Sequence, residues 1–540
     1  MSRVVAACFA WGLVPVLTVA CAAGEASDVA ADAGSVCEPG KVDLNGDPAD
    51  GCEYACTPGP HAPDDPIDPS FVDENCDGTD GVVASCLFVA GSGADDFLGG
   101  APTRPLRTIP FAVDLARQKH RAVCLAGEAF TGFVVLASGV SVYGGFDATD
   151  RAFPFRRSQG AHTSITAEGT VVLASGIDAD THVEGLELHA LVPADRAAGL
   201  GAYGVRLTGG GATLFVRWNT IATDDARSGG DGAPGADGAP GIQGRKGQNG
   251  VSAAGGPAPG NGGSDGGESV PSACGGAPSG KGGQGGWDKG NGANGDDGSE
   301  PAAKGGGGGN GSQTCGFSSG GSGGKGGDAT IPGPDGSAGA APAVVVALGD
   351  DGLFTPAIAP GGVSGAPGSS GAGGGGGAGG TNGGLCNGDR GGGGGSGGTG
   401  GCGGASGTGG EGGGASLGIA AVRGKLVVAG NTLRIGRGGS GGNGGAGGKG
   451  GGGGAGGLAS ANGDDGGAGG GGGNGAPGGS GGGGAGGLGG PSACIAVTKS
   501  VALDQASSSQ CTLGGGGAGG KGAGPANDGP SGPSAELLTL

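Results

Sequence analysis

Glycine dominates this chain and limits what it can fold into. It supplies 153 of the 540 residues, and most of these lie after residue 228. Glycine has no side chain to bury and loses the most backbone freedom on ordering, so such a region cannot fold around an ordinary apolar core. Either main-chain packing orders the region, or it has no fixed structure.

The glycines follow two patterns with a period of three residues. Between residues 229 and 250 every third residue is glycine, and between residues 438 and 458 the repeat is Gly-Gly-X. Both match the three-residue turn of the polyproline II helix, in which a glycine edge lets chains pack closely. The first run is short for a collagen triple helix and breaks at Val251. We therefore expect disorder or polyglycine II packing rather than a triple helix.

The rest of the composition leaves room for only a small apolar core. Hydrophobic residues make up 35% of the chain and aromatic residues 4%, with a net charge of −20. Fifteen of the 48 acidic side chains, but only two of the 28 basic ones, lie in the first 80 residues. This balance disfavours nucleic acid as a partner, because phosphates would be repelled. It suits divalent cations near the N-terminus, or an acidic linker that is simply solvated.

The first twenty residues have the pattern of an export signal. Arg3 precedes an apolar stretch at 4–19, and residues 18–21 (Thr-Val-Ala-Cys) resemble a bacterial lipobox before a lipidated cysteine. The stretch is short for a transmembrane helix. We expect lipidation of Cys21, with residues 21–36 as a tether, or ordinary cleavage close to Cys21. Both place the protein outside the cytoplasm, and lipidation predicts a lipoprotein of the outer membrane or cell surface.

Twelve cysteines follow Cys21, an even number that fits an oxidising compartment. Spacing around the glycine-rich segments suggests three local pairs: Cys274 with Cys315, Cys386 with Cys402, and Cys494 with Cys511. Further disulfide candidates nearer the N-terminus are Cys52, Cys56, Cys86 and Cys124. Because no C-x-x-C pair is present, zinc is not the expected use of these cysteines.

Residues 37–81 form a module rich in Cys and Asp. Its oxygen-bearing side chains alternate along the chain, as in loops that bind Ca²⁺. The candidate ligands are Asp43, Asn45, Asp47, Asp50 and Glu53 in one cluster, and Asp73, Asn75 and Asp77 in a second. The second cluster, with its Cys-Asp-Gly core, resembles a metal-binding repeat of secreted bacterial surface proteins. The module is either a Ca²⁺ site or a disulfide-linked spacer.

Residues 82–228 contain the most conventional pattern of the chain. Short apolar runs bounded by Gly, Ser, Asp or Asn predict strands at 86–89, 122–125, 133–136, 140–143, 170–173, 183–188, 204–207 and 213–216. Residues 108–116, with Thr108 as a cap and an early Pro110, predict a helix. One helix followed by many short strands favours an all-β parallel β-helix with an N-terminal cap. A β-sandwich fits the strand lengths as well.

An internal repeat favours the β-helix. Pairs of apolar runs at 203–207 with 213–221, 417–422 with 425–433, and 493–497 with 500–503 each precede a glycine-rich tract, with a weaker copy at 343–346. Two of these pairs contain an Asn-Thr-[Ile/Leu] step, at Asn219 and Asn431. Coils of a solenoid stack only on their neighbours, so insertions can leave one corner without disturbing the stack. We predict one solenoid over 82–535, with insertions at about 229–342, 360–416, 436–491 and 514–533.

A family resemblance accompanies this pattern. The segment from Cys86 through residues 105–109 to 139–146 (Gly-Val-Ser-Val-Tyr-Gly-Gly-Phe) resembles the opening of secreted bacterial proteins with pectate-lyase-like right-handed parallel β-helices. The glycine-rich part is similar to surface proteins of the PE-PGRS type, without their N-terminal domain. The resemblance implies a right-handed solenoid outside the cell. It also raises the possibility of a polysaccharide lyase or hydrolase.

Catalytic chemistry of that kind needs clustered carboxylates with a base, or a spaced acid pair. Within the predicted strands and turns the charged side chains are Glu184, Glu187, Arg206, Arg217, Asp178 and Asp180. Outward charges on a solenoid are usually a solvated face, so we assign no catalytic residue. His182 and His189 are a suggestive pair, but their spacing matches no established ligand motif.

These observations predict a non-enzymatic cell-surface lipoprotein, structural or adhesive, that displays glycine-rich loops on a β-helix. Its expected partners are the membrane, through a lipid anchor, and an extracellular polysaccharide or matrix. A carbohydrate-active enzyme and a divalent-metal-binding surface protein are the alternatives.

Overall fold

The computed structural model describes residues 37–47, 49, 51–149, 154–252, 262–311, 318–382, 387–505 and 508–540. The predictions for the signal and tether, including Cys21, and for Asp50, Cys315 and Cys386 lie outside the described residues. The described chain divides into two compact units. The first contains residues up to 66 together with 72–82, and the second contains residues 67–71 and 83–540.

The first unit is small and depends on covalent links. Strand β1 (Lys41–Val42) pairs in antiparallel fashion with β2 (Tyr54–Ala55). Disulfides Cys37–Cys52 and Cys56–Cys76 hold the surrounding loops. Because so few side chains of this unit are buried, the disulfides replace much of the work of an apolar core.

The second unit contains three parallel sheets. Sheet 1 contains β6 (Val134–Leu136), β10 (Thr170–Ala174), β13 (Ala202–Leu207), β18 (Ser416–Ala421), β21 (Ser492–Val497) and β24 (Ser534–Thr539). Sheet 2 contains β3 (Cys86–Val89), β4 (Ala122–Ala126), β7 (Val142–Asp147), β11 (Thr181–Glu184), β14 (Thr213–Arg217), β19 (Gly424–Ala429) and β22 (Val501–Gln505), with β8 (Arg156–Arg157) antiparallel to β7. Sheet 3 contains β5 (Ala129–Thr131), β9 (Thr163–Glu168), β12 (Leu186–Leu191), β15 (Thr220–Thr223), β20 (Thr432–Ile435) and β23 (Gln510–Leu513).

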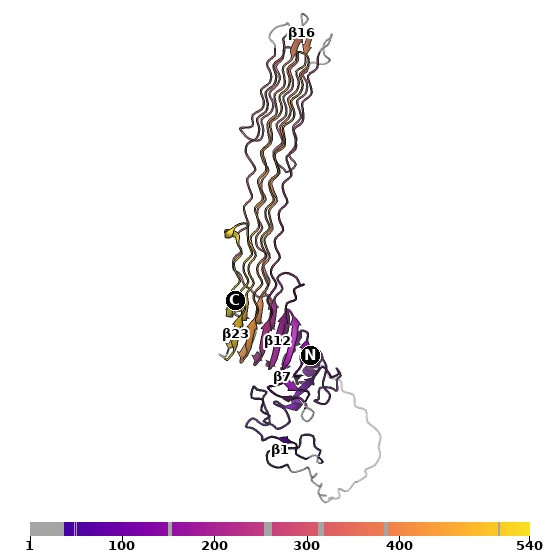
Figure 1. Cartoon of the computed structure of the whole chain (residues 1–540), viewed down its shortest axis with the longest axis vertical. Helices are drawn as coiled ribbons and strands as arrows, with labels where there is room; N and C mark the ends of the chain where they lie inside the picture. Colours follow the sequence, from indigo (N-terminus) through magenta and orange to yellow (C-terminus); the bar gives the residue numbers. More distant parts are fainter. Residues whose placement is uncertain are drawn as a thin grey trace, which may run out of the picture. The chain divides into compact units, whose positions relative to one another are not determined.

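The chain visits these sheets in rotation. Strands β10, β11 and β12 are followed by β13, β14 and β15, then by β18, β19 and β20, and then by β21, β22 and β23. Each strand pairs in parallel with the strand at the equivalent place in the next turn of the chain. The protein is therefore mostly parallel β-sheet, an arrangement compatible with the predicted parallel β-helix (Figure 1).

The apolar core lies between the three sheets and under one helix. Val183, Val205 and Ile221, one from each sheet, are fully buried in the same cluster. Helix α1 (Ile109–Lys119) starts after Thr108 with Pro110 in its first turn, which confirms the predicted helix. Its buried residues recur at helical spacing and join this core cluster. Among the described residues, no helix has both the length and the apolar character needed to span a bilayer.

Two strand predictions need correction, and some strands were not predicted. The predicted strand 183–188 is two strands, β11 and β12, because Gly185 has a φ of +69° and turns the chain from sheet 2 to sheet 3. Strands β5 and β9 were not predicted, because their sequences are short or rich in Thr, Ser and Glu. Residues 343–346 form no strand. Instead, the segment from Val346 to Phe354 packs on the outer face of sheet 1.

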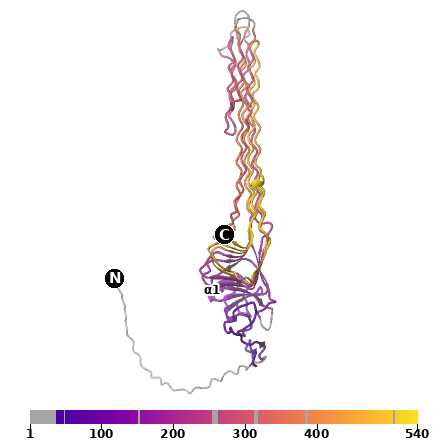
Figure 2. The same ribbon diagram turned by 90° about the vertical axis from the view of Figure 1, so that its left-hand side faces the viewer.

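The glycine-rich tracts leave the sheets at one equivalent corner, but the insertions predicted at 229–342 and 360–416 are parts of one tract, because the described residues between them form no strand of the three sheets. Residues 224–415, 436–491 and 514–533 each follow a strand of sheet 3 and return to a strand of sheet 1. Figures 1 and 2 show the first two tracts as extended chains that run side by side from the sheets to the antiparallel pair β16 (Gly380–Asn382) and β17 (Asn387–Asp389), whereas the third tract turns back much closer to the sheets. Near the C-terminus, the third tract contains a short 3-10 helix, η3 (Pro525–Asn527).

Hydrogen bonds between backbone groups hold the glycine-rich chains together. The amides of Gly232, Gly235 and Gly238 donate to the carbonyls of Asn443, Ala446 and Lys449 over 2.7–2.8 Å. The same period of three continues along this pair of chains and recurs between others. The described tracts thus follow the expectation of packed chains rather than that of disorder, and backbone groups supply the contacts that side chains supply elsewhere.

The number of glycines in each triplet matches the number of neighbouring chains. In the Gly-X-Y run, a Cβ at Gly232 would lie 2.2 Å from the Thr408 carbonyl oxygen, while X and Y are exposed. In the Gly-Gly-X run, Gly441 and Gly442 each face a different chain at 2.0 Å. Residues 373–377 are all glycine, are all buried, and face three other chains in turn. At these positions the neighbouring backbone leaves no room for a Cβ, so only glycine fits.

Side chains at Y positions of the Gly-X-Y run accept hydrogen bonds from amides that no backbone carbonyl reaches. The Oδ1 atoms of Asp231, Asp237 and Asn249 accept hydrogen bonds from the amides of Asn443, Lys449 and Ala461 over 2.6–3.1 Å. Two triplets separate Asp231 from Asp237, so both side chains project from the same edge of their chain. The polar residues at these Y positions thus have a structural role.

Candidate functional site

The disulfides differ from the predicted pairs in one important place. Five disulfides join described cysteines: Cys37–Cys52, Cys56–Cys76, Cys86–Cys124, Cys274–Cys402 and Cys494–Cys511. The pair Cys494–Cys511 is confirmed. The predicted pairs Cys274–Cys315 and Cys386–Cys402 are wrong, because Cys274 bonds to Cys402, 128 residues away on another chain of the bundle. Sequence spacing could not identify this pair, because the two cysteines are 128 residues apart and come together only when extended segments pack side by side.

These bonds also bear on the environment of the protein. Several disulfides in both units indicate an extracellular or otherwise oxidising environment. Cys37 and Cys76 were not among the named disulfide candidates, although the even cysteine count had included them.

The candidate metal ligands of the first cluster mostly bind their own loop. Asp43 accepts the amide of Gly46, Asn45 accepts that of Asp47, and Asp47 accepts that of Ala49, over 2.7–2.9 Å. Glu53 accepts the amides of Leu44 and Asn45 over 2.9 and 3.2 Å. These are turn-forming contacts of short polar side chains.

The second cluster behaves in the same way. Asp73 accepts the amides of Asp77 and Gly78, and Asn75 also accepts that of Asp77. In the part of the chain that the structure describes, no group of three or more His, Cys, Asp or Glu side chains is arranged to hold a metal ion. Ca²⁺ binding by these residues stays a prediction.

Asp65 is the perturbed carboxyl group of this unit, and sequence reasoning missed it. Its side chain is buried and accepts the amides of Glu74 and Gly81 over 3.1 and 2.9 Å. Burial, with a smaller contribution from the charges of Asp73 and Asp77, raises the pKa of Asp65 to about 6. Asp65 lies in a Pro/Asp-rich stretch that looks like linker, so no pattern marked it.

This pKa predicts a pH dependence for the first unit. The folded unit binds one more proton than the unfolded chain between about pH 4 and pH 6, so its free energy of unfolding should fall as pH rises through that interval. Asp65→Asn should remove the fall, whereas Asp64→Asn, at an exposed neighbour, should keep it. The midpoint of thermal unfolding, followed through the amide signals of this unit by NMR, measures the effect. An unchanged pH profile in Asp65→Asn would contradict it.

On the outer face of sheet 2 the structure brings together two of the predicted charged residues. Glu184 and Arg217 are register partners on β11 and β14, and Oε1 of Glu184 accepts a hydrogen bond from Nε of Arg217 over 2.6 Å. Nδ1 of His182 lies 2.7 Å from the same oxygen, and the His182 ring stacks on Phe215 at 4.4 Å. Glu184 is fully buried, so this is an ion pair that links two strands.

Neighbouring charges also stabilise turns or strand edges. Glu187 pairs with His162 and His189 pairs with Asp224, both at 2.9 Å, on sheet 3. His182 and His189 therefore lie on different sheets and make no common site. Asp178 and Asp180 accept the amides of Gly211 and Thr213, each over 3.0 Å, in the turns between successive coils.

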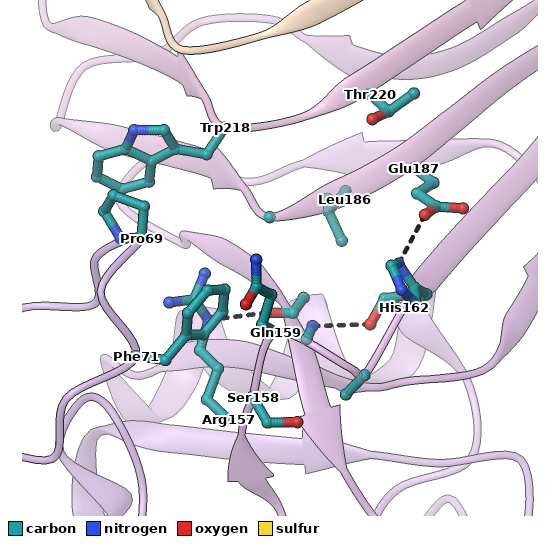
Figure 3. Close-up of a pocket in the computed structure, with 15 residues that line it drawn as sticks. Pro69, Phe71, Arg157, Ser158, Gln159, His162, Leu186, Glu187, Trp218 and Thr220 are labelled. Atoms are coloured by element: carbon teal, nitrogen blue, oxygen red, sulfur yellow. Dashed lines mark hydrogen bonds and ion pairs between the residues drawn. The ribbon is translucent and has the colours of Figure 1, made fainter.

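A cleft of about 210 Å³ opens beside these residues, where sheets 2 and 3 meet (Figure 3). One wall carries Trp218 and Phe71, and the guanidinium of Arg157 lies 4.7 Å from the centre of the Phe71 ring. Gln159 lies between the walls, and the His162–Glu187 pair closes the other side. Aromatic faces with nearby polar groups suit a ligand that has both a flat apolar face and hydroxyl groups.

No sequence pattern marks this cleft. Phe71, Arg157 and Trp218 are far apart along the chain, and only the stacking of coils brings them together. Trp218 follows β14 at the corner before β15, where its φ is +55°, and its ring lines the cleft. Comparison with known proteins adds no assignment: no protein-family model matches the chain, and neither a curated protein nor a solved structure is similar to it.

Proposed function

We propose that this protein is an exported, non-enzymatic surface lipoprotein. In this proposal a right-handed parallel β-helix carries the glycine-rich chains as a stiff bundle that contacts an extracellular polysaccharide or matrix. Cys21 is the lipid anchor, residues 22–36 are the tether, and residues 37–81 are a spacer that could also bind Ca²⁺.

The observation that carries the proposal is the joint packing of the three excursions. The first bonds to the second through Gly232 and Asn443, and the second bonds to the third through Gly441 and Ala518, over 2.7 and 2.8 Å. An insertion that is only a long loop would not need hydrogen bonds to the other insertions. Excursions that leave one corner and share hydrogen bonds form a single element, whose exposed X positions are available to a partner.

The regular exposed side chains of the bundle favour contact over catalysis. The exposed X positions of the second excursion include Asn443, Lys449 and Ala455, which recur at triplet spacing along the chain. Such a surface suits many weak contacts with a repetitive polymer. The cleft of Figure 3 would add a contact for a sugar ring.

Labelling with radioactive palmitate tests the anchor. Wild-type protein should be labelled and should sediment with membranes, and Cys21→Ser should be unlabelled and released, because the thiol is the acceptor of the lipid. Cells with the wild-type protein should retain extracellular polysaccharide better than cells with Cys21→Ser. An unlabelled wild type, or release of reducing ends from uronate polymers by the pure protein, would contradict the proposal.

A further inference from the structure

A second pocket, of about 480 Å³, lies on the outer face of sheet 1. Its walls are mainly rings and aliphatic side chains from β13, from the loop before it and from the segment that covers this sheet. The residues that matter here are Phe133, Leu200, Tyr203, Arg206, Leu353 and Phe354. The hydroxyl oxygen of Tyr203 accepts the amide of Phe354 over 3.0 Å, which fixes the covering segment against the sheet.

Arg206 is the exceptional residue of this pocket. Its side chain is only 9% exposed, and it forms no ion pair with any described residue. Nη1 donates to the backbone carbonyl of Asp351, but Nε is buried and has no hydrogen-bond partner among the described residues. The guanidinium carbon lies 5.9 Å from the centre of the Tyr203 ring. Burial also lowers the pKa of Arg206.

The nearby carboxylates are engaged elsewhere. The side chain of Asp351 accepts the amide of Leu353 over 3.0 Å, and Glu168 on the rim pairs with Arg196 at 2.7 Å. The charge of Asp351 offsets part of the cost of burying Arg206, but no carboxylate of the described residues forms an ion pair with it. A buried cation without such a partner is costly, and the planar guanidinium of arginine matches a carboxylate. The walls around it offer carbon rather than hydrogen-bonding groups. A ligand that fits must therefore combine one carboxylate with an apolar body.

We propose that this pocket binds a small organic carboxylate, with its charge on Arg206 and its aromatic or aliphatic body against Tyr203, Phe354 and Phe133. This site is separate from the cleft of Figure 3 and does not depend on the proposed surface function. The ligand would lie on the outer face of sheet 1, beside the segment from Val346 to Phe354 that covers it.

Calorimetry on the full-length protein tests the site with three probes: cinnamate, octanoate and the uncharged cinnamamide. At least one acid should bind, and cinnamamide should bind at least tenfold more weakly than cinnamate if the body is aromatic. Tighter binding of octanoate would instead identify an aliphatic body. Arg206→Met should weaken binding of the preferred acid at least tenfold and leave any binding of the amide unchanged.

Two controls separate ligand binding from structure. Arg423→Met removes an exposed arginine that pairs with Asp350 beside the same segment, and it should leave acid binding unchanged. Arg206→Met should unfold close to the wild-type temperature, since it removes a buried charge that has no ion-pair partner among the described residues and loses one hydrogen bond, to the Asp351 carbonyl. If Arg206→Met does not fold, Arg206→Lys provides the test. It keeps the positive charge but lacks the planar guanidinium, and it should weaken binding of the acid several-fold. Absence of acid binding, equal binding of acid and amide, or unchanged binding in the Arg206 variant that folds would overturn the proposal.

Discussion

Replacing Gly451 by alanine should lower the free energy of unfolding of the glycine-rich bundle by about 3 kcal/mol. A Cβ at this position would lie 2.0 Å from the carbonyl oxygen of Ala239 on the neighbouring chain. The clash is with backbone rather than with a flexible side chain, so neither chain can yield without losing hydrogen bonds. Thermal unfolding of the full-length variant, followed by circular dichroism, measures the loss.

The adjacent residue supplies the control. A Cβ at Gly452 would meet nothing within 4 Å, and neither glycine has a positive φ that alanine would avoid. Gly452→Ala should therefore leave stability unchanged or raise it by up to about 1 kcal/mol, because alanine restricts the unfolded chain. Equal effects of the two substitutions would show that packing between chains does not explain the glycine pattern.

Asn219→Ala should destabilise the coils of the sheets by roughly 3 kcal/mol or more, since it leaves several buried backbone groups unsatisfied. The side chain of Asn219 accepts the amide of Leu186 over 3.0 Å and donates to the carbonyl of Val183 over 2.8 Å. It also donates to Asn431 of the next coil, whose own amide nitrogen bonds to the carbonyl of Val216. The two asparagines form a buried ladder at the corner between sheets 2 and 3.

The denaturation midpoint in guanidinium chloride gives the size of this effect. Asn310→Ala, at an exposed position, is the matched control and should stay within about 0.5 kcal/mol of the wild type. A loss at Asn219 no larger than at Asn310 would mean that the ladder does not hold the coils together.

The sequence predicts much of this fold, because its patterns report local requirements. A glycine at every third position indicates one closely packed neighbouring backbone, as at Gly232. Glycine at two of every three positions indicates two such neighbours, as at Gly441 and Gly442. The repeated strand pairs report the shared corner, and the step at Asn219 and Asn431 marks the ladder, although its role was not evident from the residues alone.

The parts that the sequence could not predict depend on which distant segments meet. Gly185 breaks an apolar run into two strands because the chain changes sheet there, which no local pattern records. Cys274 pairs with Cys402 because their chains are neighbours in the bundle. Arg206 looked like a solvated charge, and only the return of the segment around Phe354 buries it.

Amide hydrogen exchange along residues 442–457 tests the central claim most directly. The amides of Gly448, Gly451 and Gly454 donate to carbonyls of the chain at 399–405, whereas those of Gly450 and Gly453 have no partner among the described residues. We expect slow exchange at Gly448, Gly451 and Gly454 and faster exchange at Gly450 and Gly453, in step with the Gly-Gly-X repeat. Uniform exchange at the rate of an unstructured chain would contradict the claim that backbone packing orders the glycine-rich tracts.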